Sequence, residues 1–584
     1  MNPDDNDDND EEYEDFDEGA QAAEDQEPSG APDTAVPSDV IFDEVWKLPE
    51  FDERKKESFQ TSLPAFKNLN LNEEKDPLNV FLACLPMEYF QSTLIPATNE
   101  VLGPDRQVDL GELLRWLGVT LMICSYVGCS RDEFWKRPID EFDVCAYVGG
   151  IMSKARYEAI RGAIRLSKEA TIRAIPFKDP FAHVREFISA WNANMTAQFS
   201  PGWRVCLDES MVAWLNRWTC PGWIALLRKP HPFGNEYHTI ACSFCHIIFN
   251  VELVEGRDHP VQLGKPEFDE AFGKNGGTIL RLTKPIWHTG RVVIMDSAFC
   301  QLQALIELKR RGLFSTSVIK KKRYWPKYIR GDEMDAKVAD SPIGSTSALS
   351  GTKDGVKFHL LALRDSKHVL KLMTTYGTFT EVEPPKRRVD PATGARVQFK
   401  YPEVVAEYYQ TRHAVDDNNN IRQGSVGLED QFATRSWFLR QFIALVAISE
   451  ANTFAFINWK CRNDSGFVPD TLTKFRRTLA RRLFNNPFWH DSQPEILSDD
   501  ISPPQKRLRS DDGAHILKKA PLFSGAYLGK KDGVHTWATI NSEYFKRPCS
   551  GPQCGFKMRT YCTCNPAQFW CETCFFLVHT NQAA

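Results

Sequence analysis

The chain has 584 residues, which is too long for one hydrophobic core, and its 42% hydrophobic and 12% aromatic residues are sufficient to pack several domains. The formal net charge of -6 is unevenly distributed, because Asp and Glu dominate residues 1–28 and the remainder of the chain is net basic. A net basic remainder permits a nucleic-acid partner. Membrane insertion and secretion are not expected, because no apolar run reaches the length of a bilayer crossing and no basic segment precedes an apolar one at the N-terminus.

The N-terminal part is predicted to pass from a disordered acidic tail into an all-helical domain. Residues 1–45 combine the acidic run with a Pro-, Gly- and Ser-containing linker and have too few apolar residues to fold. Residues 46–200 show helical periodicity, and Asp109-Leu-Gly-Glu112 is typical of a capping box. Nothing in this domain indicates catalysis. The ten cysteines between Cys84 and Cys461 are spaced as buried free thiols would be.

Two predicted strands of the next segment, residues 201–335, carry an aspartate directly after an apolar run, Asp208 within a strand that continues beyond it and Asp296 at the end of its strand. Val205-Cys-Leu leads into Asp208, and Val292-Val-Ile-Met leads into Asp296. Taken alone, Asp296 fits the N-cap of the helix that follows, but the matching frame of Asp208 favours two carboxylates on neighbouring strands. Carboxylates that close repel each other unless a cation lies between them, and hard oxygen ligands select Mg²⁺ or Mn²⁺. Two such ions can clamp the attacking and leaving oxygens of a phosphoryl transfer.

A third carboxylate is needed for such a site, and the residues alone leave its identity open. Residues 336–403 alternate as strands and are predicted as a β insertion or a continuation of the sheet. Helix then resumes over residues 404–459, with a break at 416–420. The candidates around that break are Asp416, Asp417, Glu429 and Asp430.

A basic run within the 201–335 segment is predicted to contact a DNA backbone. It comprises Lys320, Lys321, Lys322 and Arg323. Tyr324 and Trp325 follow it, and charge next to aromatic rings suits a nucleic-acid groove, although a charge run is more often only a solvated face.

The C-terminal residues predict a zinc module after a linker. Residues 487–545 are irregular, and their basic cluster at 504–509 fits either a nuclear-import signal or solvated charge. Residues 546–584 then concentrate soft ligands at the density of a metal site. These ligands are Cys549, Cys554, Cys562, Cys564, Cys571, Cys574 and His579. One tetrahedral site takes four ligands and two take eight, so one or two zinc ions fit, with His535 the nearest candidate for an eighth ligand.

The residues around the two aspartates resemble motifs of the piggyBac transposases. Cys206-Leu-Asp208-Glu209-Ser-Met211, followed by Arg217, resembles the first catalytic block, and Lys229-Pro230 resembles the basic motif after it. Val293-Ile-Met-Asp296-Ser-Ala-Phe299 resembles the second block.

The third block of that family is matched by Tyr408 with Val415-Asp416 at the family offset. Asn419 stands where the family carries an accessory aspartate, which keeps an oxygen ligand but removes a charge. A rival alignment through Leu428-Glu429 would place Gly427 at the third catalytic position and imply an inactive enzyme. The agreement of Tyr408, Val415 and Asp416 favours the first alignment.

The resemblance spans roughly residues 40–580 and implies an α/β fold with an RNase H-like catalytic core in two parts, residues 201–335 and 404–486, separated by the β insertion. It implies that residues 46–200 form a dimerisation and DNA-binding domain and that residues 546–584 form a zinc-binding, cysteine-rich domain.

The activity implied by the resemblance is cut-and-paste transposition of double-stranded DNA into TTAA targets by a nuclear homodimer. Asp208, Asp296 and Asp416 would be the catalytic residues and, with Asn419, would hold two Mg²⁺ or Mn²⁺ ions. The implied DNA contacts are Arg217, Lys229 and the basic run at 320–323. The alternative is a domesticated, catalytically inactive transposase-derived protein that still binds DNA.

Overall fold

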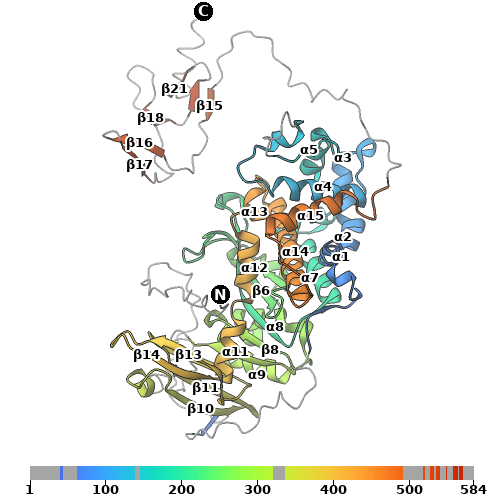
Figure 1. Ribbon diagram of the computed structural model, residues 1–584. Coiled ribbons are helices and arrows are strands. Elements are labelled where there is room, and N and C mark those ends of the chain that lie inside the picture. The colour runs from blue at the N-terminus through green and yellow to red at the C-terminus, as the bar shows by residue number, and fades with distance from the viewer. Residues whose placement is uncertain are drawn as a thin grey trace, which may run out of the picture. The chain divides into compact units, whose positions relative to one another are not determined.

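The computed structural model describes residues 62–137, 145–319 and 336–490 in full, and elsewhere the backbone of short strands. The chain divides into two compact units, Met1–Ser492 and Gln493–Ala584 (Figure 1). The first unit holds the predicted helical domain and both parts of the predicted catalytic core.

The helical region of the first unit is built on short amphipathic helices, as predicted for residues 46–200. Asp109 caps α4, because its side chain accepts a hydrogen bond from the Glu112 backbone N–H at 2.8 Å. The Glu112 side chain binds Arg156 rather than closing the capping box. The helices are α1 (Pro77–Ala83), α2 (Met87–Tyr89), α3 (Ile95–Leu102), α4 (Leu110–Ile123), α5 (Lys154–Ala163), α6 (Glu169–Ala174) and α7 (Ala182–Gln198).

A mixed sheet forms the centre of the first unit. Its strand order is β1-β10-β11-β12-β9-β8-β4-β6-β5, with β7 paired to β6. Strand β4 runs parallel to β8 and β8 parallel to β9, whereas β4, β6 and β7 pair antiparallel. The strands flanking the predicted site are β4 (Arg204–Ala213), β5 (Trp223–Ala225), β6 (Phe233–Cys242), β7 (Ile248–Leu253), β8 (Val292–Met295) and β9 (Phe314–Val318).

The segment predicted as a β insertion, residues 336–403, largely continues this central sheet. Strands β10 (Thr346–Lys353), β11 (Val356–Arg364) and β12 (Val369–Thr374) pair in succession and join β9. Only β13 (Glu381–Val389) and β14 (Arg396–Pro402) form a separate hairpin. The alternating pattern identified these strands, but their attachment to the central sheet depends on the pairing of β12 with β9, which is distant in sequence.

Strand β1 (Val40–Asp43) pairs antiparallel with β10, inside the range predicted as a disordered tail. The acidic composition of residues 1–28 concealed this β-branched and aromatic tetrapeptide, which satisfies the free edge of β10. The rest of the predicted tail lies outside the described residues.

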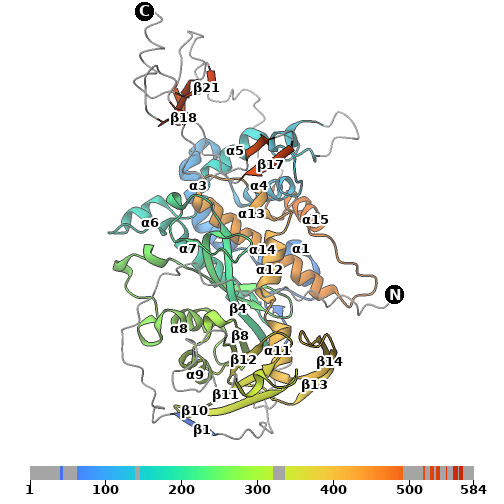
Figure 2. The same ribbon diagram turned by 90° about the vertical axis from the view of Figure 1, so that its left-hand side faces the viewer.

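Helices cover both faces of the sheet (Figure 2). Val293 and Met295 of β8 join the core that contains α8 (Asp269–Thr283) and α9 (Leu302–Arg310). Val292 and Ile294 point the other way, into a core shared with α11 (Glu403–Thr411). Because side chains alternate along a strand, Asp296, the residue after Met295, continues the alternation on the same side as Val292 and Ile294.

The helix α14 (Trp437–Cys461) joins the sheet to the helical region. Its length and composition would suit a membrane crossing, contrary to the sequence-based expectation that no run is long enough. However, 78% of its most apolar 18-residue stretch is buried inside the protein. Trp191 of α7 donates a hydrogen bond to Ser449 of α14 at 3.1 Å. The helix α14 is therefore part of the protein core.

The helix α15 (Leu472–Phe484) packs against α4, where a Cβ added to Gly118 would lie 2.9 Å from Leu483. In the described residues, Arg476 of α15 is fully buried and pairs with Glu450 of α14. This helix therefore presents part of its basic sequence to the core rather than to solvent.

The second unit contains short strands, from β15 (Leu517–Lys519) to β21 (Asn565–Phe569). Strands β15, β16 (Tyr527–Lys531) and β17 (Val534–Ala538) fall in the range predicted as an irregular linker. The side chains of the predicted zinc ligands, including His579, lie outside the described residues.

Candidate active site

Two aspartates lie side by side on neighbouring parallel strands, Asp208 within β4 and Asp296 directly after β8. The register pairs Leu207 of β4 with Met295 of β8, so Asp208 and Asp296 are the next residues on adjacent strands. Adjacent strands are about 4.8 Å apart, which places the two side chains next to each other on one face. The Asp296 side chain makes no capping hydrogen bond to the short helix at Ser297–Phe299, so the helix-cap interpretation fails.

The helix α12 (Ala414–Gln423) carries Asp416 to the same face of the sheet. Ser210 of β4 donates a hydrogen bond to Asn419 of α12 at 3.0 Å. Arg422 donates to the Met211 backbone oxygen at 3.1 Å. These contacts fix α12 along β4, two residues beyond Asp208.

The predicted break at residues 416–420 is wrong, because these residues lie within α12. Asn418 donates to the His246 backbone oxygen and to the Asn452 side chain, each at 2.9 Å. These buried tertiary hydrogen bonds override the poor helix propensity of consecutive Asp and Asn residues.

The acidic residues at this face perturb one another electrostatically. Burial raises the pKa of the Asp208 carboxyl to about 8; Lys229 opposes this increase, and the negative charges of Asp416 and Asp296 add to it. Burial likewise raises the pKa of Asp416, with Lys229 opposing it and Asp296 contributing. Clustered carboxylates of this kind form a donor set that a divalent cation would stabilise.

The three aspartates do not form a tight single-ion cage. Among the described residues, only Cys129, Glu133 and Cys145 place three ligand atoms within 4.8 Å of one another. In two-metal sites the carboxylates are divided between two ions rather than gathered around one.

Lys229 lies beside this acidic cluster, where the sequence predicted a DNA contact. Its ammonium group is 3.4 Å from the Glu209 backbone oxygen, and its charge lowers the pKa of both Asp208 and Asp416. In the metal-free protein it therefore partly neutralises the carboxylates.

Replacing Lys229 with methionine is expected to destabilise the metal-free protein at high pH only. The folded-state pKa of Asp208 exceeds its ordinary value of 3.8, so this group costs stability as pH rises from about 4 through 8. Without Lys229 that cost grows by about 1 kcal/mol at pH 9, whereas at pH 6 it hardly changes, because folded-state Asp208 is protonated there with or without Lys229. Thermal unfolding in EDTA at both values measures this, with Lys357→Met as the exposed control. Equal destabilisation at pH 6 and pH 9 would refute the electrostatic role.

Asn419 is engaged by protein donors. Its side-chain oxygen accepts hydrogen bonds from Ser210 at 3.0 Å and from Arg422 at 2.9 Å. A metal ligand role would require this oxygen to give up at least one of the two donors.

The other candidates for the third carboxylate have partners elsewhere. Glu429 is buried and forms an ion pair with Arg422. Asp430 lies 3.8 Å from the His231 ring, and Asp417 lies 3.4 Å from the His246 ring. Gly427 precedes α13 (Leu428–Gln431) and offers no ligand.

The predicted DNA contacts are only partly described. Arg217 is exposed, and its guanidinium lies 4.4 Å from the centre of the Trp218 ring, which is itself 82% exposed. This pair offers charge and an aromatic face to solvent. The run at 320–323 lies outside the described residues.

Several residues that shape the site were not identified from the sequence. Arg228 binds the buried Glu209 at 2.6 Å, and burial raises the pKa of the neighbouring Glu236 to about 7. The two hydrogen bonds that join β4 to α12, from Ser210 to Asn419 and from Arg422 to the Met211 oxygen, were also missed. No local pattern identifies these two bonds, since each joins segments about 200 residues apart.

Comparisons with known proteins agree with this architecture. Residues 76–454 match the family described as Transposase IS4. A search of curated protein sequences finds no match. Among solved structures, the chain resembles a piggyBac transposase in a synaptic complex with hairpin DNA, at 18% sequence identity and a TM-score of 0.53. The match covers 72% of this chain and 83% of that chain, and at this identity it concerns the fold.

Proposed function

The chain belongs to the Transposase IS4 family, and on that premise we propose that it is a piggyBac-like, metal-dependent DNA transposase. The observation that carries the proposal is the parallel register that sets Asp208 beside Asp296, with the Asp416 helix fixed to the same face. The strand order β7-β6-β4-β8-β9, antiparallel and then parallel, supports an RNase H-like core. Asp208, Asp296 and Asp416 would be its catalytic residues.

The three aspartates would hold two Mg²⁺ or Mn²⁺ ions, and Asn419 would join them only by releasing Ser210 or Arg422. Such ions supply Lewis-acid stabilisation and an activated water for phosphodiester cleavage. The role of the chain would be to hold the carboxylates in place, and binding of the ions would favour their ionised forms. Lys229 keeps their charges partly balanced until then.

Double-stranded DNA is the substrate in this proposal, as transposon ends and as a TTAA target. Arg217 and the run at 320–323 would contact its backbone. We further propose a nuclear homodimer, with the 504–509 cluster as the import signal and residues 546–584 holding one or two zinc ions. The chemistry of these segments supports the proposal, since basic residues suit phosphate and clustered cysteines suit zinc.

The direct test is incubation of the full chain with labelled DNA carrying the terminal repeats that flank its gene. We expect strand cleavage in Mg²⁺ or Mn²⁺ and none in EDTA, with binding in both. Binding without cleavage in either metal would contradict transposase activity and favour the inactive DNA-binding alternative. The inactive alternative is favoured by Asn419. This residue stands where the resembled family carries an accessory aspartate, and its side-chain oxygen already accepts two hydrogen bonds.

A further inference from the structure

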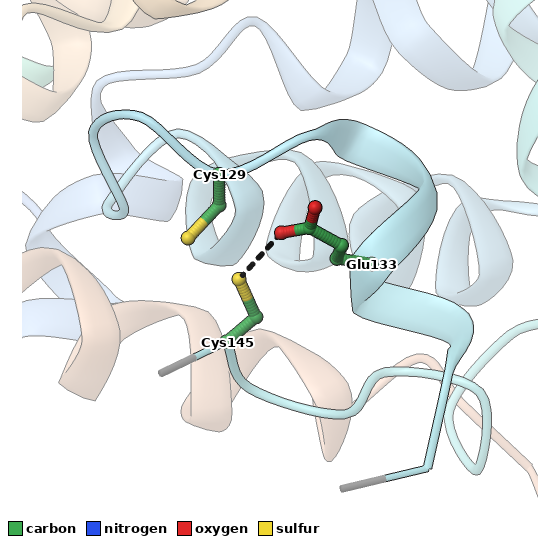
Figure 3. Close-up of side chains that lie close together, drawn as sticks. All are labelled: Cys129, Glu133 and Cys145. Carbon is green, nitrogen blue, oxygen red and sulfur yellow. Dashed lines mark hydrogen bonds between the residues drawn. The ribbon is translucent and has the colours of Figure 1, made fainter. Parts of the chain in front are cut away.

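A second cluster of metal-binding residues lies in the helical region, outside the aspartate site. Cys129 lies two residues before a short 3-10 helix, η6 (Arg131–Trp135), which contains Glu133, and Cys145 lies further along the chain. Figure 3 shows the three side chains converging, with the Cys145 thiol donating to the Glu133 carboxylate at 3.6 Å. Their ligand atoms all lie within 4.8 Å of one another.

We propose that Cys129, Glu133 and Cys145 form a zinc site. Two thiolates make a soft donor set, which selects Zn²⁺ over Mg²⁺ or Ca²⁺, and a carboxylate is a common third ligand. Tetrahedral zinc with Zn–S of about 2.3 Å and Zn–O of about 2.1 Å separates sulfur from oxygen by about 3.6 Å. The separation of the Cys145 sulfur and the Glu133 oxygen, 3.6 Å, already has this value.

Two hydrogen bonds fix η6 against the segment that follows Cys145. The Val148 backbone N–H donates to the Phe134 oxygen at 2.8 Å, and the Trp135 indole donates to the Met152 oxygen at 2.8 Å. These bonds lock η6 against the segment after Cys145, so the ligands are positioned without the ion. Glu133 is exposed and both cysteines are half-buried, which lets an ion enter. The fourth position is left to water.

The Cys145 thiol must lose its proton to bind zinc. Burial raises the pKa of the Cys145 thiol to about 12, and the neighbouring Cys129 and Glu133 add to the increase. A bound cation would reverse the penalty, because it stabilises the thiolates that binding requires. The ion would then clamp η6 to residue 145 and stabilise this corner of the helical region.

The test is zinc analysis of the full chain and of a Cys129→Ser, Cys145→Ser double variant. We expect the variant to carry one zinc ion per chain fewer than the unmodified protein. The comparison is a difference, so zinc bound by the C-terminal cysteines does not affect it. Cys461→Ser, at a buried cysteine outside the cluster, is the control and should keep its zinc. An unchanged zinc content in the double variant would overturn the proposal.

Glu133→Gln provides a second variant that does not depend on the cysteines. Because Glu133 is exposed, the substitution should leave folding intact, yet weaken zinc binding at least about tenfold. Cobalt substitution adds a spectroscopic measurement, since thiolate-to-cobalt absorption should be lower in the cysteine double variant than in the Cys461→Ser control. A Cys129–Cys145 disulfide in the purified protein, detected by non-reducing peptide mapping, would also overturn the zinc assignment.

Discussion

Replacing Asp296 with asparagine is expected to lower Mg²⁺-dependent DNA cleavage on the order of 10³-fold or more, while DNA binding is retained. Asparagine has nearly the shape of aspartate but no charge, so strand β8 and its neighbours should fold unchanged. A bound metal ion, however, would lose one charged ligand, the carboxylate that lies beside Asp208. Cleavage rates and mobility-shift binding on the same labelled end substrate measure the two effects separately.

The matched control is Asp354→Asn, which makes the same change in the turn after β10. The Asp354 side chain is exposed and pairs with the exposed Arg310 at 3.4 Å, so the substitution should leave cleavage unchanged. If Asp296→Asn retained more than about a tenth of the cleavage rate, Asp296 would not be a metal ligand in the reaction. If Asp354→Asn lost cleavage equally, the assay would be reporting instability.

The sequence predicted the two strand-borne aspartates because their signals are local. An apolar run that ends in an aspartate identifies both a buried strand and the residue at its end, as at Val292–Met295 and Asp296. In the folded sheet, β4 and β8 pair in parallel, and this pairing brings the two aspartates together. Local patterns suffice where burial and position are set by consecutive residues.

The third member of the site and its supports were less predictable from residues alone. The Asp-Asp-Asn-Asn-Asn run around Asp416 has poor helix propensity, and tertiary contacts, including those of Asn418 with His246 and Asn452, hold it in a helix. Pairing of β10 to β12 with the central sheet and the approach of Cys145 to Cys129 are similarly nonlocal. Such features depend on which surfaces meet in the folded chain, which composition and periodicity do not specify.

Replacing Arg422 with methionine is expected to destabilise the first unit by about 3–5 kcal/mol and to lower cleavage as well. Arg422 and Glu429 are both almost fully buried and form an ion pair, so removing the arginine leaves a buried carboxylate without its cation. The arginine also donates to Asn419 and to the Met211 oxygen, which fixes the Asp416 helix on β4. Denaturant unfolding measures the stability, with the exposed Arg396→Met as control.

A double variant separates the two roles of Arg422. Arg422→Met with Glu429→Leu removes both charges, and most of the lost stability should return because no unpaired buried charge remains. Cleavage should not return in proportion, since the hydrogen bonds from Arg422 to Asn419 and Met211 are still absent. Full recovery of both stability and cleavage would mean that the arginine serves only to neutralise Glu429. A loss below about 1 kcal/mol in the single variant would mean that Glu429 becomes protonated or reaches water, and that the pair contributes little to holding Asp416 in place.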